Sequence, residues 1–119
     1  MIVSMRGVAL SAGVALMANA HIALAAQGSS FGLTDIREGH VHPGMLNAVS
    51  DVIGRRRMLE LALTGRVFTV PEALTWGFIH AAMPAFELDD RAIAVAQGLA
   101  SMNADALRTV LVATLLPED

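Results

Sequence analysis

Residues 7–26, GVALSAGVALMANAHIALAA, constrain the fold of this chain more than any other stretch. They predict the end of a strand, a helix over residues 12–20 that is apolar on every side and therefore buried all round, and a second strand over residues 21–26. Small residues at positions 11–13 predict a tight turn, where the backbone can approach a ligand closely. The first amides of a helix lack intrahelical acceptors. The turn therefore predicts an oxyanion-stabilising site.

The start of the chain, residues 1–10, predicts a strand that leads into this turn. The same region also imitates a secretory signal peptide, because Arg6 is followed by an apolar run and by small residues. Apolar residues stand where a charged leader region would lie, however, and the run continues past the cleavage position. A small secreted protein with a removable signal peptide stays an alternative. A membrane span fits poorly, because Asn19 and His21 interrupt the run.

The composition restricts the classes of partner. Hydrophobic residues make up 55% of the 119 residues and charged residues only 16%, so we expect part of the surface to be covered by copies of the chain or by another segment. The net charge of −3 argues against nucleic acid, which requires a basic face. The absence of cysteine fits a reducing compartment and predicts a cytoplasmic protein.

Glycine and proline divide the middle of the chain into short elements. We expect helices over 45–53 and 55–63, a strand over 67–70, a short helix between Thr69 and Gly77, and a strand at 78–79. Thr69 and Glu72 have the spacing of a capping box, and Gly65 suits the position that follows a helix.

The last third predicts two helices without a linker before them. Asn103 suits the N-cap of the second helix. The apolar stripes of the two helices are Leu88, Ala92, Val95, Ala96 and Leu99, then Leu107, Val110, Leu111 and Thr114. We predict a core over residues 1–84 and a helical C-terminal region over residues 85–119 within one compact unit.

Several short motifs recur in an order and spacing that are specific together. They are residues 7–13 (GVALSAG), 31–36 (FGLTDI) with Gly39, 53–55 (IGR), 61–65 (LALTG), 72–74 (EAL), 76–78 (WGF) and Pro84. With these motifs the chain resembles the crotonase, or enoyl-CoA hydratase/isomerase, superfamily. The resemblance implies an α/β fold, a spiral of β-β-α units followed by a helical region. It also implies that the chain lacks the N-terminal half and the last C-terminal helices of a typical member.

The resemblance implies chemistry on acyl-CoA thioesters, with no cofactor other than the coenzyme A of the substrate. Two backbone N–H groups would hold the thioester oxygen of an enolate, and the position of one of them is Ala12. Asp35 matches a catalytic carboxylate that is glutamate in most members. The second carboxylate would fall at Ala15, which cannot transfer protons, so isomerisation is favoured over hydration. The implied partners are a trimer-type homo-oligomer or a complementing N-terminal segment.

Further residues are substrate-binding candidates, each with a plainer interpretation. Ser11 and Gly13 flank the predicted oxyanion donor but also suit an ordinary tight turn. His40 and His42 lie in a predicted loop over residues 39–44, where they could assist catalysis or simply face solvent. Two histidines without a third ligand do not make a convincing metal site, so we expect none.

Two charged features also allow two interpretations each. Asp35 could equally be a loop carboxylate that accepts backbone N–H bonds. Arginines 55–57 could meet a coenzyme A phosphate or form a solvated face. Trp76 and the methionines are expected in the core.

Overall fold

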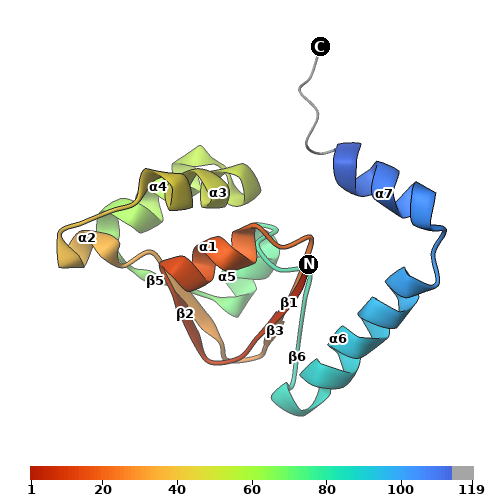
Figure 1. Cartoon of the computed structure of the whole chain (residues 1–119). Helices are drawn as coiled ribbons and strands as arrows, with labels where there is room; N and C mark the ends of the chain where they lie inside the picture. Colours follow the sequence, from red (N-terminus) through yellow and green to blue (C-terminus); the bar gives the residue numbers. More distant parts are fainter. Residues whose placement is uncertain (114–119) are drawn as a thin grey trace.

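The computed structural model describes residues 1–113, in which short strands and helices precede two C-terminal helices (Figure 1). The predicted stripe residue Thr114 lies outside the described residues. The elements are β1 (Ile2–Met5), β2 (Val8–Leu10), α1 (Ala12–Ala18), β3 (Ile22–Ala26), β4 (Ser30–Gly32), α2 (Asp35–Glu38), α3 (Pro43–Ile53), α4 (Arg55–Thr64), β5 (Val67–Thr69), α5 (Val70–Thr75), β6 (Ala81–Met83), α6 (Ala85–Ala100) and α7 (Ala104–Ala113).

The strands form two three-stranded sheets in the orders β1-β3-β6 and β2-β4-β5. The chain bends from the first sheet into the second at Gly7 and again at Gly28, with φ angles of 93° and 83° that an L side chain rarely adopts. Each bent strand pair leads into a helix, so the predicted α/β spiral of β-β-α units is confirmed. The single strand predicted over residues 1–10 is wrong, because Gly7 divides it into β1 and β2.

Aromatic rings from three segments fill the core beneath the second sheet. Phe31 of β4 lies opposite Phe68 of β5, with ring centroids 5.1 Å apart, and both side chains are fully buried. Phe78 packs edge-on against both rings, at 5.4 and 5.3 Å. Such contacts add about 0.5–1.5 kcal/mol per pair beyond burial of area. They hold β4 in place, and β4 leads towards Asp35.

Helix α1 begins at Ala12 as predicted but is not buried on every side. Val14 and Met17 are buried in the core, whereas Leu16 is 56% exposed. The apolar composition could not show that one face of the helix has no neighbour among the described residues.

The strand predicted at residues 78–79 is also wrong. The backbone amides of Phe78 and Ile79 donate to the carbonyl of Ala73, at 2.8 and 3.4 Å, and so close the end of α5 instead of joining a sheet. Both side chains are buried in the core. The strand starts later, at Ala81, where β6 pairs with β3.

The loop predicted over residues 39–44 ends earlier than expected. Helix α3 begins at Pro43, with His42 at its N-cap. Proline suits a first helical position because its missing N–H has no intrahelical partner there.

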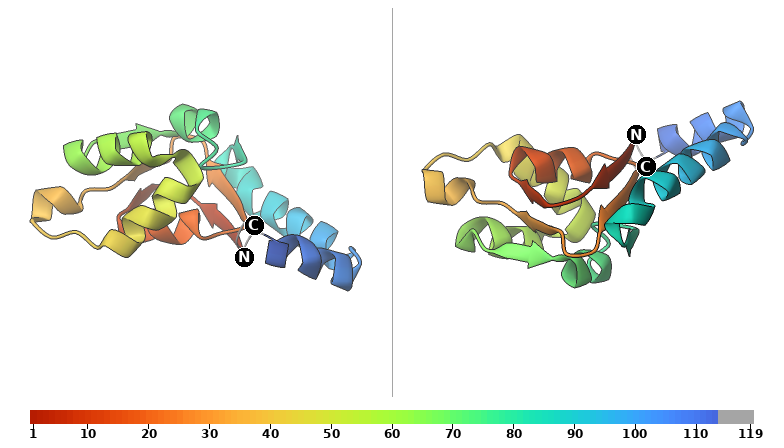
Figure 2. Two further views of the ribbon diagram at one scale, coloured as in Figure 1. Left: turned by 90° about the horizontal axis from the view of Figure 1, so that it is seen from above. Right: turned by 90° about the horizontal axis from the view of Figure 1, so that it is seen from below.

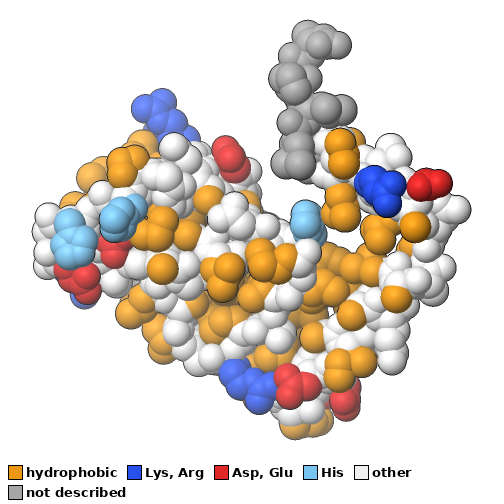
Figure 3. All heavy atoms as spheres, in the orientation of Figure 1, with side chains coloured by type: hydrophobic (Ala, Val, Ile, Leu, Met, Phe, Trp, Pro, Cys, Tyr) orange, Lys and Arg blue, Asp and Glu red, His pale blue; other side chains and the backbone are white. Residues whose placement is uncertain are grey.

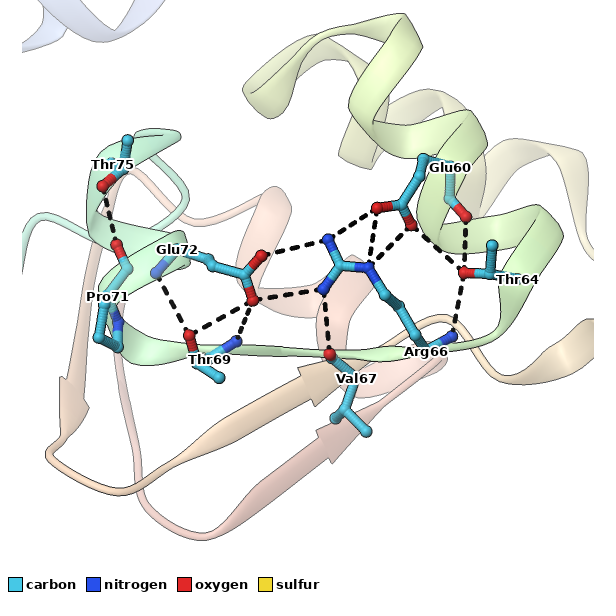
Figure 4. Close-up of polar contacts among 8 residues, drawn as sticks. All are labelled: Glu60, Thr64, Arg66, Val67, Thr69, Pro71, Glu72 and Thr75. Atoms are coloured by element: carbon cyan, nitrogen blue, oxygen red, sulfur yellow. Dashed lines mark hydrogen bonds and ion pairs between the residues drawn. The ribbon is translucent and has the colours of Figure 1, made fainter.

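A cluster of charged side chains joins α4 to α5 across β5 (Figure 4). The predicted capping box is confirmed, since Thr69 N donates to Glu72 Oε1 at 3.1 Å and Glu72 N donates to Thr69 Oγ1 at 3.4 Å. Arg66 donates to Glu60 from Nε at 2.8 Å and to Glu72 from Nη2 at 3.1 Å. We call Glu60, Arg66 and Glu72 the ionic clamp.

The ionic clamp favours the charged form of each member. Hydrogen bonds from Arg66 lower the pKa of Glu60 and the pKa of Glu72, and the two carboxylates raise the pKa of Arg66. Trp76 lies against the cluster, with the Arg66 guanidinium carbon 5.8 Å from its ring centroid and that of Arg57 5.5 Å away. Trp76 is partly buried and packs against the core rather than lying within it.

We predict that Arg66→Met lowers the melting temperature at pH 7 by about 3 °C, because two carboxylates lose their partner. Glutamate pKa values lowered below the ordinary 4.5 mean that the ion pairs stabilise the fold above that pH. This stabilisation disappears as the pH falls through the lowered values. Urea unfolding of both proteins across this range measures the effect.

Arg56→Met is the matched control, because Arg56 is exposed at the start of α4. The difference in unfolding free energy between Arg56→Met and wild type should not change as the two glutamates ionise. If Arg66→Met were less stable than wild type by the same amount from neutral to acid pH, the ion pairs of Arg66 would not be the source of the stabilisation.

Helices α6 and α7 extend from the body as an arm (Figure 2). Leu88 anchors α6, since it packs in a second small core with Leu24, Ala26 and Met83. Asn103 caps α7 as predicted, because its side-chain oxygen accepts a hydrogen bond from Ala106 N at 2.9 Å. Among residues 1–113 no helix is long and apolar enough to cross a membrane.

Candidate active site

The parallel pairing of β2 with β4 brings two candidate segments to one edge of the second sheet. Leu10 lies opposite Gly32, and the next amide, Ser11 N, donates to Gly32 O at 2.8 Å. The chain continues from β2 into α1, and from β4 through two residues to Asp35. Ligands of α/β proteins commonly bind beyond the carboxyl ends of parallel strands. The edge where residues 11–13 and Asp35 follow the strands is therefore the candidate site.

Ser11 has an unusual backbone conformation at the front of α1. Its φ is 46° and its ψ is −100°, and it is the one described residue other than glycine with a positive φ. Such a conformation costs of order 1–3 kcal/mol and often occurs at ligand sites. The sequence gives no signal for it, because serine there suggests an ordinary N-cap, yet the Ser11 side chain makes no capping bond.

The amide of Ala12 is available to a ligand. Ala12 is the first residue of α1 and is exposed. Within residues 1–113 neither its N–H nor that of Gly13 donates a hydrogen bond. The predicted helix start and its unpaired amides are thus present.

Apolar side chains flank the site on one face of the sheet. A Cβ placed on Gly32 would lie 3.3 Å from Leu10 Cδ2 and 3.6 Å from Val67 Cγ1. Leu10 is 46% exposed and Val67 is 47% exposed. These two residues are not among the candidates predicted from the sequence. The alternation along β2 and β5 was the available signal, since each strand buries only its central residue.

Asp35 is the first residue of the short helix α2 and is half-buried. Among the described residues its carboxylate accepts no hydrogen bond, and only its backbone carbonyl accepts one, from Gly39 N at 3.1 Å. The alternative that this side chain accepts backbone N–H bonds in a loop is therefore wrong. Its carboxylate is free for another role. Ala15, the position implied for a second carboxylate, is buried in α1.

The other candidates are not joined to this arrangement by hydrogen bonds among the described residues. The rings of His40 and His42 are 6.4 Å apart, and both residues are exposed. In the described part of the chain no hydrogen bond links them to Asp35 or to the Ser11 turn. No group of three metal-ligating side chains occurs there either. Arg55 and Arg56 are exposed beside an open hollow.

We predict that Ser11→Ala changes the free energy of unfolding by less than about 0.5 kcal/mol, because the serine side chain caps nothing. Ser11→Gly should stabilise the protein by up to about 1 kcal/mol, because glycine adopts this backbone conformation without strain. Denaturant unfolding measures both values.

Thr69→Ala is the control, since Thr69 makes a real capping box and its loss should cost about 1 kcal/mol. Destabilisation by Ser11→Gly would show that the turn is not strained.

Comparisons with known proteins show the family of the chain. The family model described as enoyl-CoA hydratase/isomerase matches residues 1–115. The chain belongs to this family. It is 26% identical over 111 residues to the mevalonyl-coenzyme A hydratase of Aspergillus fumigatus, covering 92% of this chain and 41% of that protein. It is 31% identical over 104 residues to human enoyl-CoA hydratase domain-containing protein 3, covering 86% of this chain and 34% of that protein.

A solved structure supports the same assignment. An enoyl-CoA hydratase/isomerase family protein from Silicibacter pomeroyi superimposes with a TM-score of 0.87 at 33% identity, covering 98% of this chain and 52% of that chain. The chain thus spans between a third and about half of the length of these relatives.

Proposed function

We propose that this enoyl-CoA hydratase/isomerase family chain binds acyl-CoA thioesters and stabilises an enolate at the Ala12 amide. The observation that carries the proposal is the unpaired amide of Ala12 at the edge where β2 and β4 end. A hydrogen-bond donor there could hold the thioester oxygen as negative charge develops on it. Leu10 and Val67 offer an exposed apolar surface for the acyl chain.

Asp35 is the proposed acid and base. Its carboxylate would take a proton from the carbon next to the thioester carbonyl, and the electron pair of that bond would move into the carbonyl to give the enolate. Return of the proton to another carbon of the conjugated system would complete an isomerisation. One carboxylate suffices for this sequence. Hydration, as the hydratases of the family carry it out, uses two carboxylates, and Ala15 supplies none.

We predict that the chain exchanges the α-proton of a short acyl-CoA for deuterium in D2O, and that Asp35→Asn slows this exchange at least about 100-fold. The amide side chain cannot accept the proton, whereas the affinity for acyl-CoA should stay largely unchanged. Mass spectrometry of the thioester gives the exchange rate, and calorimetry gives the affinity.

Glu38→Gln is the matched control, because Glu38 is an exposed carboxylate on the same helix. Equal exchange rates in Asp35→Asn and wild type would remove Asp35 from the mechanism. Failure of the wild-type chain to bind acyl-CoA would remove the proposed function itself.

A second function, association without catalysis, has its own supporting observations. Within residues 1–113 no strand pairs with the outer edges of β1 and β2. The arm carries exposed apolar side chains, including Phe86 at 81% and Val110 at 66% exposure. Figure 3 shows hydrophobic side chains across the face between body and arm. A homo-oligomer or a complementing segment of a longer relative would cover such surfaces.

Light scattering of the purified chain, alone and mixed with the Silicibacter pomeroyi relative, tests this second function. A larger assembly that neither binds acyl-CoA nor exchanges its α-proton would favour association over catalysis. A chain that stays monomeric in both samples would contradict it.

A further inference from the structure

The side chain of Arg37 lies across Gly65, where α4 ends. A Cβ placed on Gly65 would come within 2.8 Å of Arg37 Nε, 3.2 Å of Cγ and 3.4 Å of Cδ. Gly65 also has a φ of 66°, which closes α4 in the left-handed conformation. The missing side chain therefore provides the space in which the arginine lies. A cation is favourable there, because the carbonyl end of a helix is negative.

Few other contacts hold helix α2, which carries Arg37 and Asp35, against the body of the protein. It is four residues long, has no buried residue, and gains no side-chain cap from Thr34. Its main packing partner is α4. The contact of Arg37 with Gly65 is thus a principal attachment of this short helix to the body.

The far side of this contact is firmly held. Arg66 follows Gly65 directly and binds Glu60 of α4 and Glu72 of α5 through the ionic clamp. Two residues later, Phe68 is fully buried in the aromatic core. Gly65 therefore belongs to a firmly held junction, and the exposed side chain of Arg37 lies against it.

We propose that Arg37 is a positioning residue that fixes α2, and with it the carboxylate of Asp35, through its contact with Gly65. The functional part of this inference rests on the proposed role of Asp35. The contact uses the aliphatic stem as well as Nε, so a long uncharged side chain should replace most of it. A reacting group displaced by about 1 Å can lose about 100-fold in rate, so the attachment matters for catalysis.

The first test measures the order of α2. In Arg37→Ala, backbone 15N order parameters of residues 36–38 should fall below about 0.6, from about 0.85 in the rigid wild type. Gly65→Asn should have the same effect, because asparagine tolerates the left-handed conformation while its side chain displaces Arg37. Arg37→Met should keep the wild-type order.

Two controls separate the contact from general damage. Gly77→Asn changes a glycine with a φ of 76° whose added Cβ meets nothing within 4 Å, so α2 should stay ordered. Glu38→Ala removes an exposed neighbour of Arg37 on the same helix and should also leave the order unchanged. Unchanged order parameters in Arg37→Ala would overturn the proposal.

The second test distinguishes positioning from a purely structural role. Arg37→Ala should slow α-proton exchange of acyl-CoA about 10- to 100-fold with an unchanged dissociation constant, and Arg37→Met should restore the rate. Loss of order without loss of rate would overturn the positioning role. A wild-type chain without exchange would refute the proposed function, while the order parameters would still decide whether Arg37 fixes α2.

Discussion

The stacking of Phe31 on Phe68 is the interaction on which the arrangement of this chain depends. The two residues face each other across the antiparallel pair β4 and β5, and Phe78 closes the cluster from the end of α5. Because β4 is fixed on this side, its other edge can pair in parallel with β2. That pairing sets the position of the Ser11 turn relative to the segment that leads to Asp35.

Two kinds of support therefore meet at the candidate site. The strands supply rigid positions for Ser11 and Gly32, whereas Asp35 lies on a short helix that is attached through Arg37 and Gly65. The ionic clamp stabilises the junction behind that attachment, although none of its members belongs to the site. The ionic clamp thus acts at a distance from the proposed chemistry, through the geometry of α4 and β5.

Local signals in the sequence predicted much of this fold. Thr69 and Glu72 form a capping box because the spacing alone brings each side chain to the other's amide. Gly65 ends α4 because the left-handed conformation is open to glycine. The turn before Ala12 and the amides of α1 follow from the same kind of short-range rule.

The remaining features depend on distant neighbours. The strain at Ser11 arises where β2, paired with β4, must enter α1, and no local pattern reports it. The sequence predicts a strand at Phe78, but its ring is buried in the core and its amide closes α5. Leu16 is exposed because no described element covers that face of α1. Leu10 and Val67 flank Gly32 only once β2, β4 and β5 are side by side.

The order of strands in the first sheet has a consequence for how the chain reaches this structure. Leu24 of β3 pairs with Ala81 of β6, 57 residues further along. Closing so long a loop is entropically costly, and folding slows as contacts become more distant in sequence. The apolar edge of β3 that pairs with β6 therefore stays unpaired after β3 has paired with β1. During synthesis that edge stays unpaired until residues 81–83, which form β6, have been made.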